Sequence, residues 1–292
     1  GAEAAGAAGR TGVTAAVAVE LVHAFSLLHD DIMDGDTDRR RRPTVWKAYG
    51  TGPAVLAGDA LFALAVETLA TAPGGAAGVR LLSAALADLV RGQADDLLFS
   101  TRPWTGPERV RPEEYRAMAE HKTGALLGCA AALGASLGGA PKSTVTALDR
   151  AGRHLGTAFQ TIDDVLGIWG DPAVTGKPVH GDLRERKKTY PVLAAFDSPA
   201  ARHLPALLDA GETEAAAALI EECGRRGAPR GEAPPHHAAP GGPRPRRGAV
   251  PPPPTTGRPG VRAHRRGGGA RDRRRAAVSA GLPGAPRPVK PC

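Results

Sequence analysis

The sequence predicts an all-α protein, a bundle of mostly buried helices followed by a disordered tail. Residues 1–223 contain no sustained alternation of apolar and polar residues, which is the pattern of a half-buried strand. They contain instead long runs of Ala, Leu and Val, interrupted by Gly, Pro and polar clusters. A chain of 292 residues can form one large domain or two small ones. We therefore expect one helical domain over residues 1–223.

The tail, residues 224–292, differs in composition from the residues before it. It holds 16 of the 38 basic residues and 2 of the 30 acidic ones, so its charge is +14 and that of residues 1–223 is −6. With 15 Pro, 13 Gly and five large apolar residues, it cannot bury enough surface to offset the entropy of ordering. Arginine-rich segments can bind nucleic acid, but this one has no aromatic residue to stack on bases, so we expect no nucleic-acid partner. A shifted reading frame near Cys223 is the explanation that we favour over a functional tail.

The cysteines and the apolar runs disfavour several other classes of protein. Cys129, Cys223 and Cys292 are far apart and show neither a disulfide framework nor a zinc-binding spacing, and Cys129 is expected to pack in the core. No signal peptide is visible, and no apolar run reaches the ~18 residues of a membrane span. We expect a cytoplasmic protein without a transmembrane segment. The chain begins at Gly1 in an Ala- and Gly-rich run, so we also expect that its natural N-terminal part is missing.

The breaks between apolar runs define the expected helices. Pro43 closes the turn after the first helix, because the residue before a proline is pushed out of helical geometry. Pro112, with two acids after it, is a good helix start. Helices are expected over residues 13–34, 54–70, 79–99, 112–138, 149–169, 191–196 and 200–223.

The stretch Leu27–Pro43, LLHDDIMDGDTDRRRRP, is the first candidate site. Asp30, Asp31 and Asp34 end the first expected helix, and four arginines follow them. Asp30 and Asp34 are four residues apart and share a helix face, where two like charges are unfavourable without a cation. Mg²⁺ prefers carboxylate, phosphate and water oxygens, and arginines bind phosphate. The stretch therefore predicts a site for a diphosphate and Mg²⁺.

The simpler interpretation is a solvated acidic helix end followed by a basic turn. Residues 17–28, which precede the acids, are apolar on nearly every side, so we expect this helix to be buried. A buried helix that presents three carboxylates at its end is costly without counter-ions. The functional interpretation is therefore favoured.

A second acidic cluster, FQTIDDVLGIWGDPAVTGKP, occupies residues 159–178. Asp163 and Asp164 lie in an apolar helix, and Gln160 precedes Asp164 by one turn. Local ion pairs with nearby basic residues are the alternative interpretation. Two such clusters on buried helices predict the opposed walls of one cavity with metal ions between them.

Several lysines are candidates for binding phosphate. Most lysines are solvated surface charges, and this is the simplest interpretation of Lys177, Lys187 and Lys188. Lys122 and Thr123 differ, because they interrupt a helix that continues with Ala, Leu and Gly. A lysine and a hydroxyl at this place would contact a phosphate held by the metals.

Five motifs together resemble the trans-polyprenyl diphosphate synthases. In chain order they are DDIMDGDTDRRRRP, GDALFALA at 58–65, GQADD at 92–96, HKTGALLG at 121–128 and FQTIDDVLGIWGD. Their order and spacing match the family over roughly residues 11–222. The resemblance implies the isoprenoid-synthase fold, an all-α helical bundle with a central apolar cavity, and a homodimer. It also implies Mg²⁺-dependent elongation of an allylic diphosphate (dimethylallyl, geranyl or farnesyl) by isopentenyl diphosphate.

The resemblance assigns roles to the matching positions. Asp30 and Asp34, supported by Asp31, would bind two Mg²⁺ ions, and Asp163, beside Asp164, would bind a third. Two arginines would contact the diphosphates, Arg39 that of the allylic substrate and Arg40 that of isopentenyl diphosphate. The other residues implied at the site, as cationic wall or lining of the reacting centre, are Gln93, Lys122, Thr123, Gln160, Lys177 and Lys187. Those expected to be catalytic are Lys122, Thr123, Gln160 and Lys177.

The implied chemistry fits these residue types. Breaking the allylic C–O bond puts charge on the departing diphosphate, which metals and cations stabilise. Attack by the isopentenyl double bond and loss of a proton then require no protein nucleophile. Phe25, five positions before Asp30 and followed by the small Ser26, would floor the cavity and implies a C20 product, geranylgeranyl diphosphate. Core packing is the alternative role of Phe25.

Some positions depart from the pattern of the family. Gly167 stands where a third acid is usual in the second cluster, and Arg41 and Arg186 stand where glycine is common. The basic motif that precedes the first cluster in the family is not in this sequence, and the tail replaces the last helices. Two alternatives to a prenyl elongase therefore stay open. One is a class I terpene cyclase on the same fold, and the other is a non-catalytic fragment or partner subunit.

Overall fold

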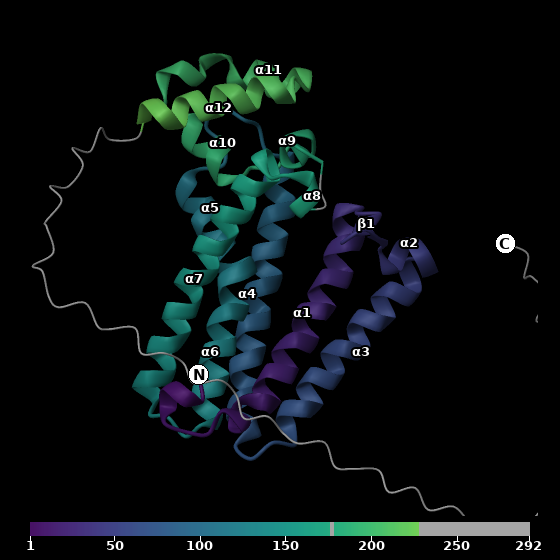
Figure 1. Cartoon of the computed structure of the whole chain (residues 1–292), viewed down its shortest axis with the longest axis vertical. Helices are drawn as coiled ribbons and strands as arrows, with labels where there is room; N and C mark the ends of the chain where they lie inside the picture. The colour runs from purple at the N-terminus through teal and green to yellow at the C-terminus, as the bar shows by residue number, and fades with distance from the viewer. Residues whose placement is uncertain (176–177, 228–292) are drawn as a thin grey trace, which may run out of the picture. The chain divides into compact units, whose positions relative to one another are not determined.

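The computed structural model describes residues 1–175 and 178–227, and these residues are almost entirely helical (Figure 1). The strands within them are β1 (Asp38–Arg39) and β2 (Arg42–Pro43), which form a two-residue antiparallel hairpin in the arginine-rich turn. The prediction of an all-α protein is confirmed. Most of the predicted tail, residues 228–292, lies outside the described residues.

Five long helices form the body of the bundle. In Figure 1 they lie side by side in the order α7, α6, α4, α1 and α3, and α11 and α12 lie across one end. The long helices are α1 (Val13–Asp34), α3 (Thr51–Ala70), α4 (Gly75–Thr101), α6 (Ala125–Leu137) and α7 (Lys142–Trp169). The other helices are η1 (Glu3–Ala5), η2 (Gly9–Gly12), α2 (Val45–Tyr49), α5 (Pro112–Ala119), η3 (Glu120–Gly124), α8 (Pro172–Thr175), α9 (Gly181–Arg184), α10 (Tyr190–Ala195), η4 (Pro199–His203), α11 (Leu204–Ala210) and α12 (Thr213–Gly227).

The largest differences from the predicted helices have local causes. The helix expected over residues 112–138 is divided by η3, a single turn of π-helix, a form that is frequent at functional sites. The segment expected as one helix over 200–223 is divided at Gly211, which ends α11 in the left-handed conformation (φ +73°). α7 begins at Lys142, seven residues before the predicted start.

Two apolar cores hold these helices together. The first joins α1, α3, α4 and α6 through residues such as Val22, Leu69, Leu82 and Leu133, and the free thiol of Cys129 is buried among them as predicted. The second joins the end of α7 to helices α9 to α12, and its buried members include Trp104, Ile168, Leu183, Val192, Leu204 and Ile220. The second core holds α9 and α10 against the end of α7, and Lys187, which lies between α9 and α10, has its Nζ atom 3.7 Å from Asp34 Oδ2 of α1.

Glycines allow α4, η3 and α7 to approach closely. A Cβ atom at Gly92 of α4 would overlap the backbone nitrogen of Lys122 in η3. A Cβ atom at Gly156 of α7 would in turn meet the backbone of Gly124. The turn that carries Lys122 and Thr123 is therefore held between two helices at backbone contact distance.

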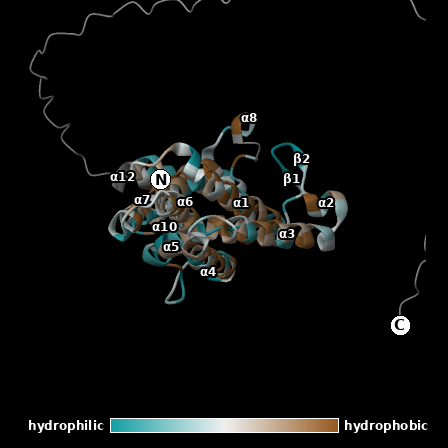
Figure 2. Cartoon of the chain, turned by 90° about the horizontal axis from the view of Figure 1, so that it is seen from below, coloured by the Kyte–Doolittle hydropathy of each residue, from teal (hydrophilic) through white to brown (hydrophobic). Residues whose placement is uncertain are grey.

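The expectation that no apolar run is long enough to span a membrane needs a correction at two helices. The segments Gly9–Asp34 and Thr51–Ala70 are long and apolar enough to cross a membrane by length and composition alone. Hydrophobic residues colour both α1 and α3 in Figure 2. Mostly buried core helices meet the same criterion, but only 17% of the apolar window in the first segment and 22% of that in the second is buried. The expectation of a buried first helix is therefore wrong for most of its residues, because only one side of α1 packs in the first core.

Candidate active site

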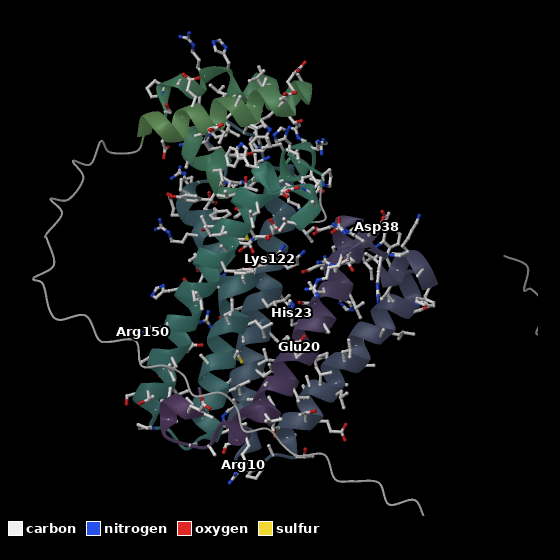
Figure 3. The ribbon with its side chains drawn as sticks, in the orientation of Figure 1. Arg10, Glu20, His23, Asp38, Lys122 and Arg150 are labelled. Atoms are coloured by element: carbon white, nitrogen blue, oxygen red, sulfur yellow. The ribbon has the colours of Figure 1, made fainter. Side chains whose placement is uncertain are left out.

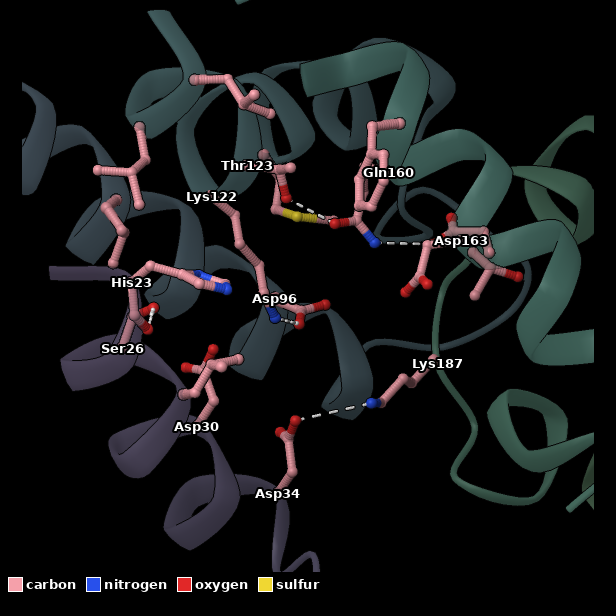
Figure 4. Close-up of a pocket in the computed structure, with 18 of the residues that line it drawn as sticks. His23, Ser26, Asp30, Asp34, Asp96, Lys122, Thr123, Gln160, Asp163 and Lys187 are labelled. Carbon is pink, nitrogen blue, oxygen red and sulfur yellow. Dashed lines mark hydrogen bonds and ion pairs between the residues drawn. The ribbon is translucent and has the colours of Figure 1, made fainter. Parts of the chain in front are cut away.

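A cavity of about 520 Å³ lies among α1, α4, η3, α6, α7 and the segment from α9 to α10 (Figure 4). Both apolar and charged side chains line it. The residues predicted from the sequence that line it are Asp30, Asp34, Arg39, Lys122, Thr123, Gln160, Asp163, Asp164 and Lys187. The structure thus brings most of the predicted site together.

α1 forms the first acidic wall. Asp30 and Asp34 line the cavity from consecutive turns of this helix. Burial raises the pKa of Asp30 to about 6, and the nearby carboxylates of Asp34 and Asp96 add to this, while the charge of Lys122 opposes it. Asp30 and Asp34 therefore form a crowded pair of acids that a bound cation would relieve.

Asp31 does not line the cavity, and its role is to hold Arg39 in place. Its side chain is buried, its Oδ1 atom accepts a hydrogen bond of 2.6 Å from Nε of Arg39, and the same atom forms an ion pair of 2.6 Å with Nη2. This charge-assisted contact fixes Arg39 at the edge of the cavity. The left-handed Gly35 (φ +71°) ends α1 directly after Asp34, so that the chain turns back and delivers Arg39.

α7 forms the second acidic wall. Asp163 lines the cavity with an exposed side chain, whereas Asp164 is buried. The carboxylate of Asp164 accepts hydrogen bonds from Tyr115 Oη (2.5 Å), Tyr190 N (2.9 Å) and Gln160 Nε2 (3.0 Å). Burial raises the pKa of Asp164, and these hydrogen bonds oppose the shift.

Gln160 connects Asp164 to the centre of the cavity. Its Oε1 atom accepts a hydrogen bond of 2.6 Å from Thr123 Oγ1, and its Nε2 atom donates to Asp164. The chain of hydrogen bonds from Tyr115 through Asp164 and Gln160 to Thr123 is drawn in part in Figure 4. It orients the amide of Gln160 and the hydroxyl of Thr123, because the amide oxygen, the amide nitrogen and the hydroxyl group each take part in a hydrogen bond of the chain.

Two lysines lie between the acidic walls. Lys122 Nζ is 2.6 Å from Asp96 Oδ2. Lys187 Nζ is 3.7 Å from Asp34 Oδ2 and 3.0 Å from Glu185 Oε2. Although burial lowers the pKa of Lys187, the carboxylates around it raise the pKa above its ordinary value, so this lysine is a permanent cation.

Four predicted residues do not line the cavity, and a fifth lies outside the described residues. Asp31 was described above, and Arg40 is exposed in the turn between β1 and β2. Gln93 is buried, and its amide nitrogen and oxygen have no hydrogen-bond partner within the described part of the chain. Lys177 lies outside the described residues. Phe25 is the fourth, and its position corrects the prediction.

Phe25 packs towards α3 instead of closing the cavity. Its ring centroid is 4.7 Å from that of His29 and 5.8 Å from that of Phe62. An α-helix turns by roughly 100° per residue, so a residue five positions before Asp30 is about 140° away from the face of Asp30. Ser26 and Leu27, which are nearer to that face, line the cavity instead.

The structure also adds residues that the sequence did not identify. Asp96 stands within the GQADD motif, so its pairing with Lys122 had a signal in the sequence. Glu20 and His23 of α1 line the cavity and lie below Lys122 in the view of Figure 3. Asp182 lines it from α9, and no spacing in the sequence connected this residue to the acidic clusters.

The acidic walls fit metal ions that a diphosphate holds from the other side. Within the described residues, no group of three or more His, Cys, Asp and Glu side chains converges on one point. Mg²⁺ commonly takes one or two carboxylates and completes its shell with phosphate oxygens and water. Burial is the main cause of the raised pKa of Asp30, so a cation bound at the first wall would favour the ionised form of this acid.

Comparisons with known proteins show the family. The family model described as polyprenyl synthetase matches residues 3–223. A (2E,6E)-farnesyl diphosphate synthase of Mycobacterium tuberculosis is 49% identical over 235 residues, which are 76% of this chain and 64% of the relative. A geranylgeranyl diphosphate synthase of the same species is 48% identical over 218 residues, 71% of this chain and 61% of the relative.

Solved structures give the same result. The crystal structure of a polyprenyl synthetase from Streptomyces coelicolor A3(2) matches with a TM-score of 0.70 and 49% identity, over 77% of this chain and 70% of that one. A geranylgeranyl pyrophosphate synthetase from Pyrococcus horikoshii Ot3 matches with a TM-score of 0.66 and 37% identity, over 73% and 67%. The chain spans less than two thirds of the length of the two mycobacterial relatives. On the match of its residues 3–223, this chain belongs to the polyprenyl synthetase family.

Proposed function

We propose that this chain is a Mg²⁺-dependent prenyltransferase that condenses isopentenyl diphosphate with an allylic diphosphate to make a short-chain polyprenyl diphosphate. The observation that carries the proposal is the cavity with Asp30 and Asp34 on one wall, Asp163 on the other, and lysines between them. Relatives named as farnesyl and geranylgeranyl diphosphate synthases support it.

The acids would hold the metal ions and the basic residues would hold the two diphosphates. In this proposal Asp30 and Asp34 would bind ions at the first wall and Asp163 at the second, with three Mg²⁺ ions in all. When bound, Mg²⁺ supplies positive charge to the diphosphate that departs from the allylic carbon. Arg39 and Lys187 line the cavity, so they would bind the phosphate oxygens directly.

Other residues would position the reacting groups. Lys122 lies opposite Asp30 in Figure 4, and its Nζ atom, now paired with Asp96, would be shared with a phosphate. Thr123 and Gln160 are oriented by the hydrogen-bond chain from Tyr115 and lie beside the reacting carbon atoms in this proposal. Arg40 and Lys177 would complete the cationic wall, with Arg40 serving isopentenyl diphosphate.

The apolar part of the cavity would hold the growing chain and exclude water from the carbocation. It descends from Asp30 to Val19 along α1, and eleven residues of helix correspond to about 16 Å. Apolar side chains line it from other helices, among them Leu89, Leu126, Leu127 and Phe159. The product that we propose is C20, geranylgeranyl diphosphate, with farnesyl diphosphate as the last primer, and a relative named as a geranylgeranyl diphosphate synthase supports it.

A cytoplasmic homodimer is the form that we propose for the enzyme. Large apolar side chains are exposed on α3 and α4, where Leu56 is 69%, Val90 60% and Leu98 60% exposed. Large exposed apolar side chains of this kind are typical of an interface when they gather in one patch. Light scattering of the purified chain measures the assembly directly, and a monomer at all concentrations would contradict it.

Product analysis tests the reaction. The purified chain is incubated with Mg²⁺, labelled isopentenyl diphosphate and one of dimethylallyl, geranyl or farnesyl diphosphate, and the products are extracted. We expect a labelled C20 diphosphate from wild type and at least a hundredfold less from Asp30→Asn, since preorganised charge at a transition state is worth about 10²- to 10³-fold. A hydrocarbon formed without isopentenyl diphosphate would indicate a cyclase. No product from wild type would assign the chain to the non-catalytic class.

A further inference from the structure

Lys188 is a buried amine on the wall of the cavity, and it lacks an acidic partner. Its residue is 4% exposed, and it lines the cavity together with Lys122 and Lys187. Those two lysines have carboxylate oxygens 2.6 Å and 3.0 Å from their Nζ atoms, whereas no carboxylate of the described residues lies within 4.0 Å of Lys188 Nζ. Lys188 donates a hydrogen bond to Arg186 O that is long, at 3.5 Å. An ammonium ion at this position is therefore poorly compensated for the water that it has lost.

The surroundings of Lys188 Nζ activate this amine. Nζ lies 3.4 Å from the ring centroid of Trp104, and the guanidinium carbon of Arg186 lies 5.8 Å from the centroid of the same residue's ring. The ring face attracts a cation, but the second cation nearby opposes the first. Burial and the charge of Arg186 lower the pKa of Lys188 to about 8. A desolvated lysine beside another cationic group is a common form of the activated amine nucleophile.

Two buried hydrogen-bond donors accompany this amine. Trp104 Nε1 and Thr189 Oγ1 are buried, and neither has a hydrogen-bond partner in the part of the chain that the structure describes. Trp104 supplies the ring against which Nζ packs, and Thr189 follows Lys188 in the sequence and lines the same cavity. A buried donor without an acceptor costs free energy, so each such group in a folded protein requires an explanation. Both donors are available to an anion formed at Lys188.

We propose that Lys188 is a site of reversible carbamylation by carbon dioxide. The lone pair of the neutral Nζ atom forms a bond to the carbon of CO₂, one C–O π bond becomes a lone pair on oxygen, and Nζ releases a proton to solvent. The product is a carbamate with a single negative charge, and no oxidant or reductant is required. Its oxygens accept hydrogen bonds from Trp104 Nε1 and Thr189 Oγ1. The guanidinium group of Arg186, which also pairs with Asp209, supplies nearby positive charge.

Other modifications of a lysine fit these surroundings less well. An imine formed with an aldehyde brings no oxygen to either donor, and an acetyl group brings a single carbonyl oxygen without charge. The carbamate brings a pair of acceptor oxygens and a negative charge beside Arg186. It also turns a cation on the cavity wall into an anion, so it changes the charge that a ligand of the cavity meets. The inference requires no turnover and is independent of the proposed function.

Carbon-13 nuclear magnetic resonance tests for the carbamate directly. Each protein is equilibrated with ¹³C-labelled bicarbonate at about pH 8, near the pKa of Lys188. Lys188→Arg keeps a cation that does not form a carbamate, and Lys142→Arg, at an exposed lysine outside the cavity, is the matched control. We expect a carbamate resonance in wild type and in Lys142→Arg that Lys188→Arg lacks. The N-terminal amine of Gly1 also reacts with CO₂, so the resonance that Lys188→Arg removes is the one assigned to Lys188.

Chemical trapping locates the carbamate in wild type without any substitution. A trialkyloxonium salt converts the carbamate into a stable ester, and mass spectrometry of proteolytic peptides identifies the residue that carries it. We expect the ester on Lys188 after equilibration with bicarbonate. This measurement decides the question even if Lys188→Arg does not fold.

The donor at Trp104 has a test of its own. Trp104→Phe keeps an aromatic ring and removes the N–H group. We expect the equilibrium constant for carbamate formation to fall roughly tenfold, because a hydrogen bond to a charged group contributes about that much. Trp46→Phe is the control, since Trp46 Nε1 already donates to Asp36 O at 2.7 Å and should leave the equilibrium constant unchanged.

The opposite outcomes are equally clear. Identical carbamate resonances in wild type and in a folded Lys188→Arg protein overturn the proposal, and so does trapping that modifies other amines but not Lys188. An unchanged equilibrium constant in a folded Trp104→Phe protein overturns the part of the proposal that assigns Trp104 Nε1 as a donor. Thermal unfolding shows which of the variants fold.

Discussion

Several single residues are strained in ways that the local sequence does not show. Arg186 has a left-handed backbone (φ +57°), as does Arg41 (φ +64°). For a residue with a Cβ atom this conformation costs about 1 to 2 kcal/mol. Arg186 offsets part of this strain, since its Nη2 atom is 2.8 Å from Asp209 Oδ1.

Replacement of Arg186 by glycine and by alanine isolates the backbone strain. Both variants lose the ion pair with Asp209, but only alanine keeps a Cβ atom in the left-handed conformation. We expect Arg186→Gly to be more stable than Arg186→Ala by about 1 kcal/mol in urea unfolding. Equal stabilities would mean that the backbone relaxes out of this conformation.

The lowered pKa of Lys188 should make the free energy of unfolding depend on pH. Burial lowers its pKa to about 8, and the charge of Arg186 adds to this. The folded protein then releases this proton near pH 8, and the unfolded chain releases it near the ordinary pKa of a lysine, about 10.4. Unfolding takes up a proton between these pH values, so stability rises with pH there.

Comparison with Lys188→Met removes the other titrating groups from the measurement. Relative to that variant, wild type should gain about 1 to 3 kcal/mol in the free energy of unfolding between pH 7.5 and 10.5, because a tenfold change in an acid dissociation constant corresponds to about 1.4 kcal/mol. Lys188 Nζ lies 3.4 Å from the ring centroid of Trp104, and this face favours the charged form. No relative gain would show that Trp104 keeps the ammonium charged.

At the scale of elements, helix packing decides where the turn that carries Lys122 and Thr123 lies. The sequence predicted the helices that carry Asp30, Gln160 and Asp163, because their apolar runs are long. It did not predict the π-helical turn η3, which depends on the contact of Gly92 with the backbone of Lys122. The positions of Lys122 and Thr123 are therefore a property of three packed helices.

A methyl group at Gly92 tests this packing. Gly92→Ala should destabilise the protein by about 1 to 3 kcal/mol through overpacking, and should move Lys122 away from Asp96. Gly52→Ala, in the first turn of α3, is the matched control, since a Cβ atom there meets nothing within 4 Å. Urea unfolding measures both, and a Gly92→Ala protein as stable as the control would contradict the close contact.

At the scale of the whole described molecule, the cavity joins elements that are far apart in the chain. Asp34 lies at the end of α1, and Lys187, its partner at 3.7 Å, follows α9. A ligand that bridges the two acidic walls should therefore stabilise the folded state as a unit. A ligand at about 100 times its Kd adds about 2.7 kcal/mol.

Thermal unfolding with Mg²⁺ and inorganic diphosphate measures this linkage. We expect the Tm to rise by several degrees with both ligands present and by much less with either alone, because each completes the site of the other. Asp34→Asn should reduce the shift, and Asp38→Asn, an exposed acid of β1 outside the cavity, should not. Equal shifts in the two variants would place the diphosphate elsewhere.

The sequence by itself determined the fold class, the long helices and most of the residues at the site. Apolar periodicity and clustered charge are local signals, and Asp30, Asp34, Lys122, Gln160 and Asp163 carry them. Only the tertiary structure decided which way each side chain points. It placed Phe25 against α3 and Asp31 against Arg39, because the phase of a packed helix selects the face that meets the cavity.

The tertiary structure also decided the contacts between distant segments. Asp182 reaches Gly167 of α7 through a loop and a four-residue helix, and Tyr115 reaches Asp164 from a different helix. No spacing in the sequence encodes such a contact, because the separation in space is set by how α5, α7 and α9 pack. Local patterns predict which residues have the chemistry, and packing determines which of them meet.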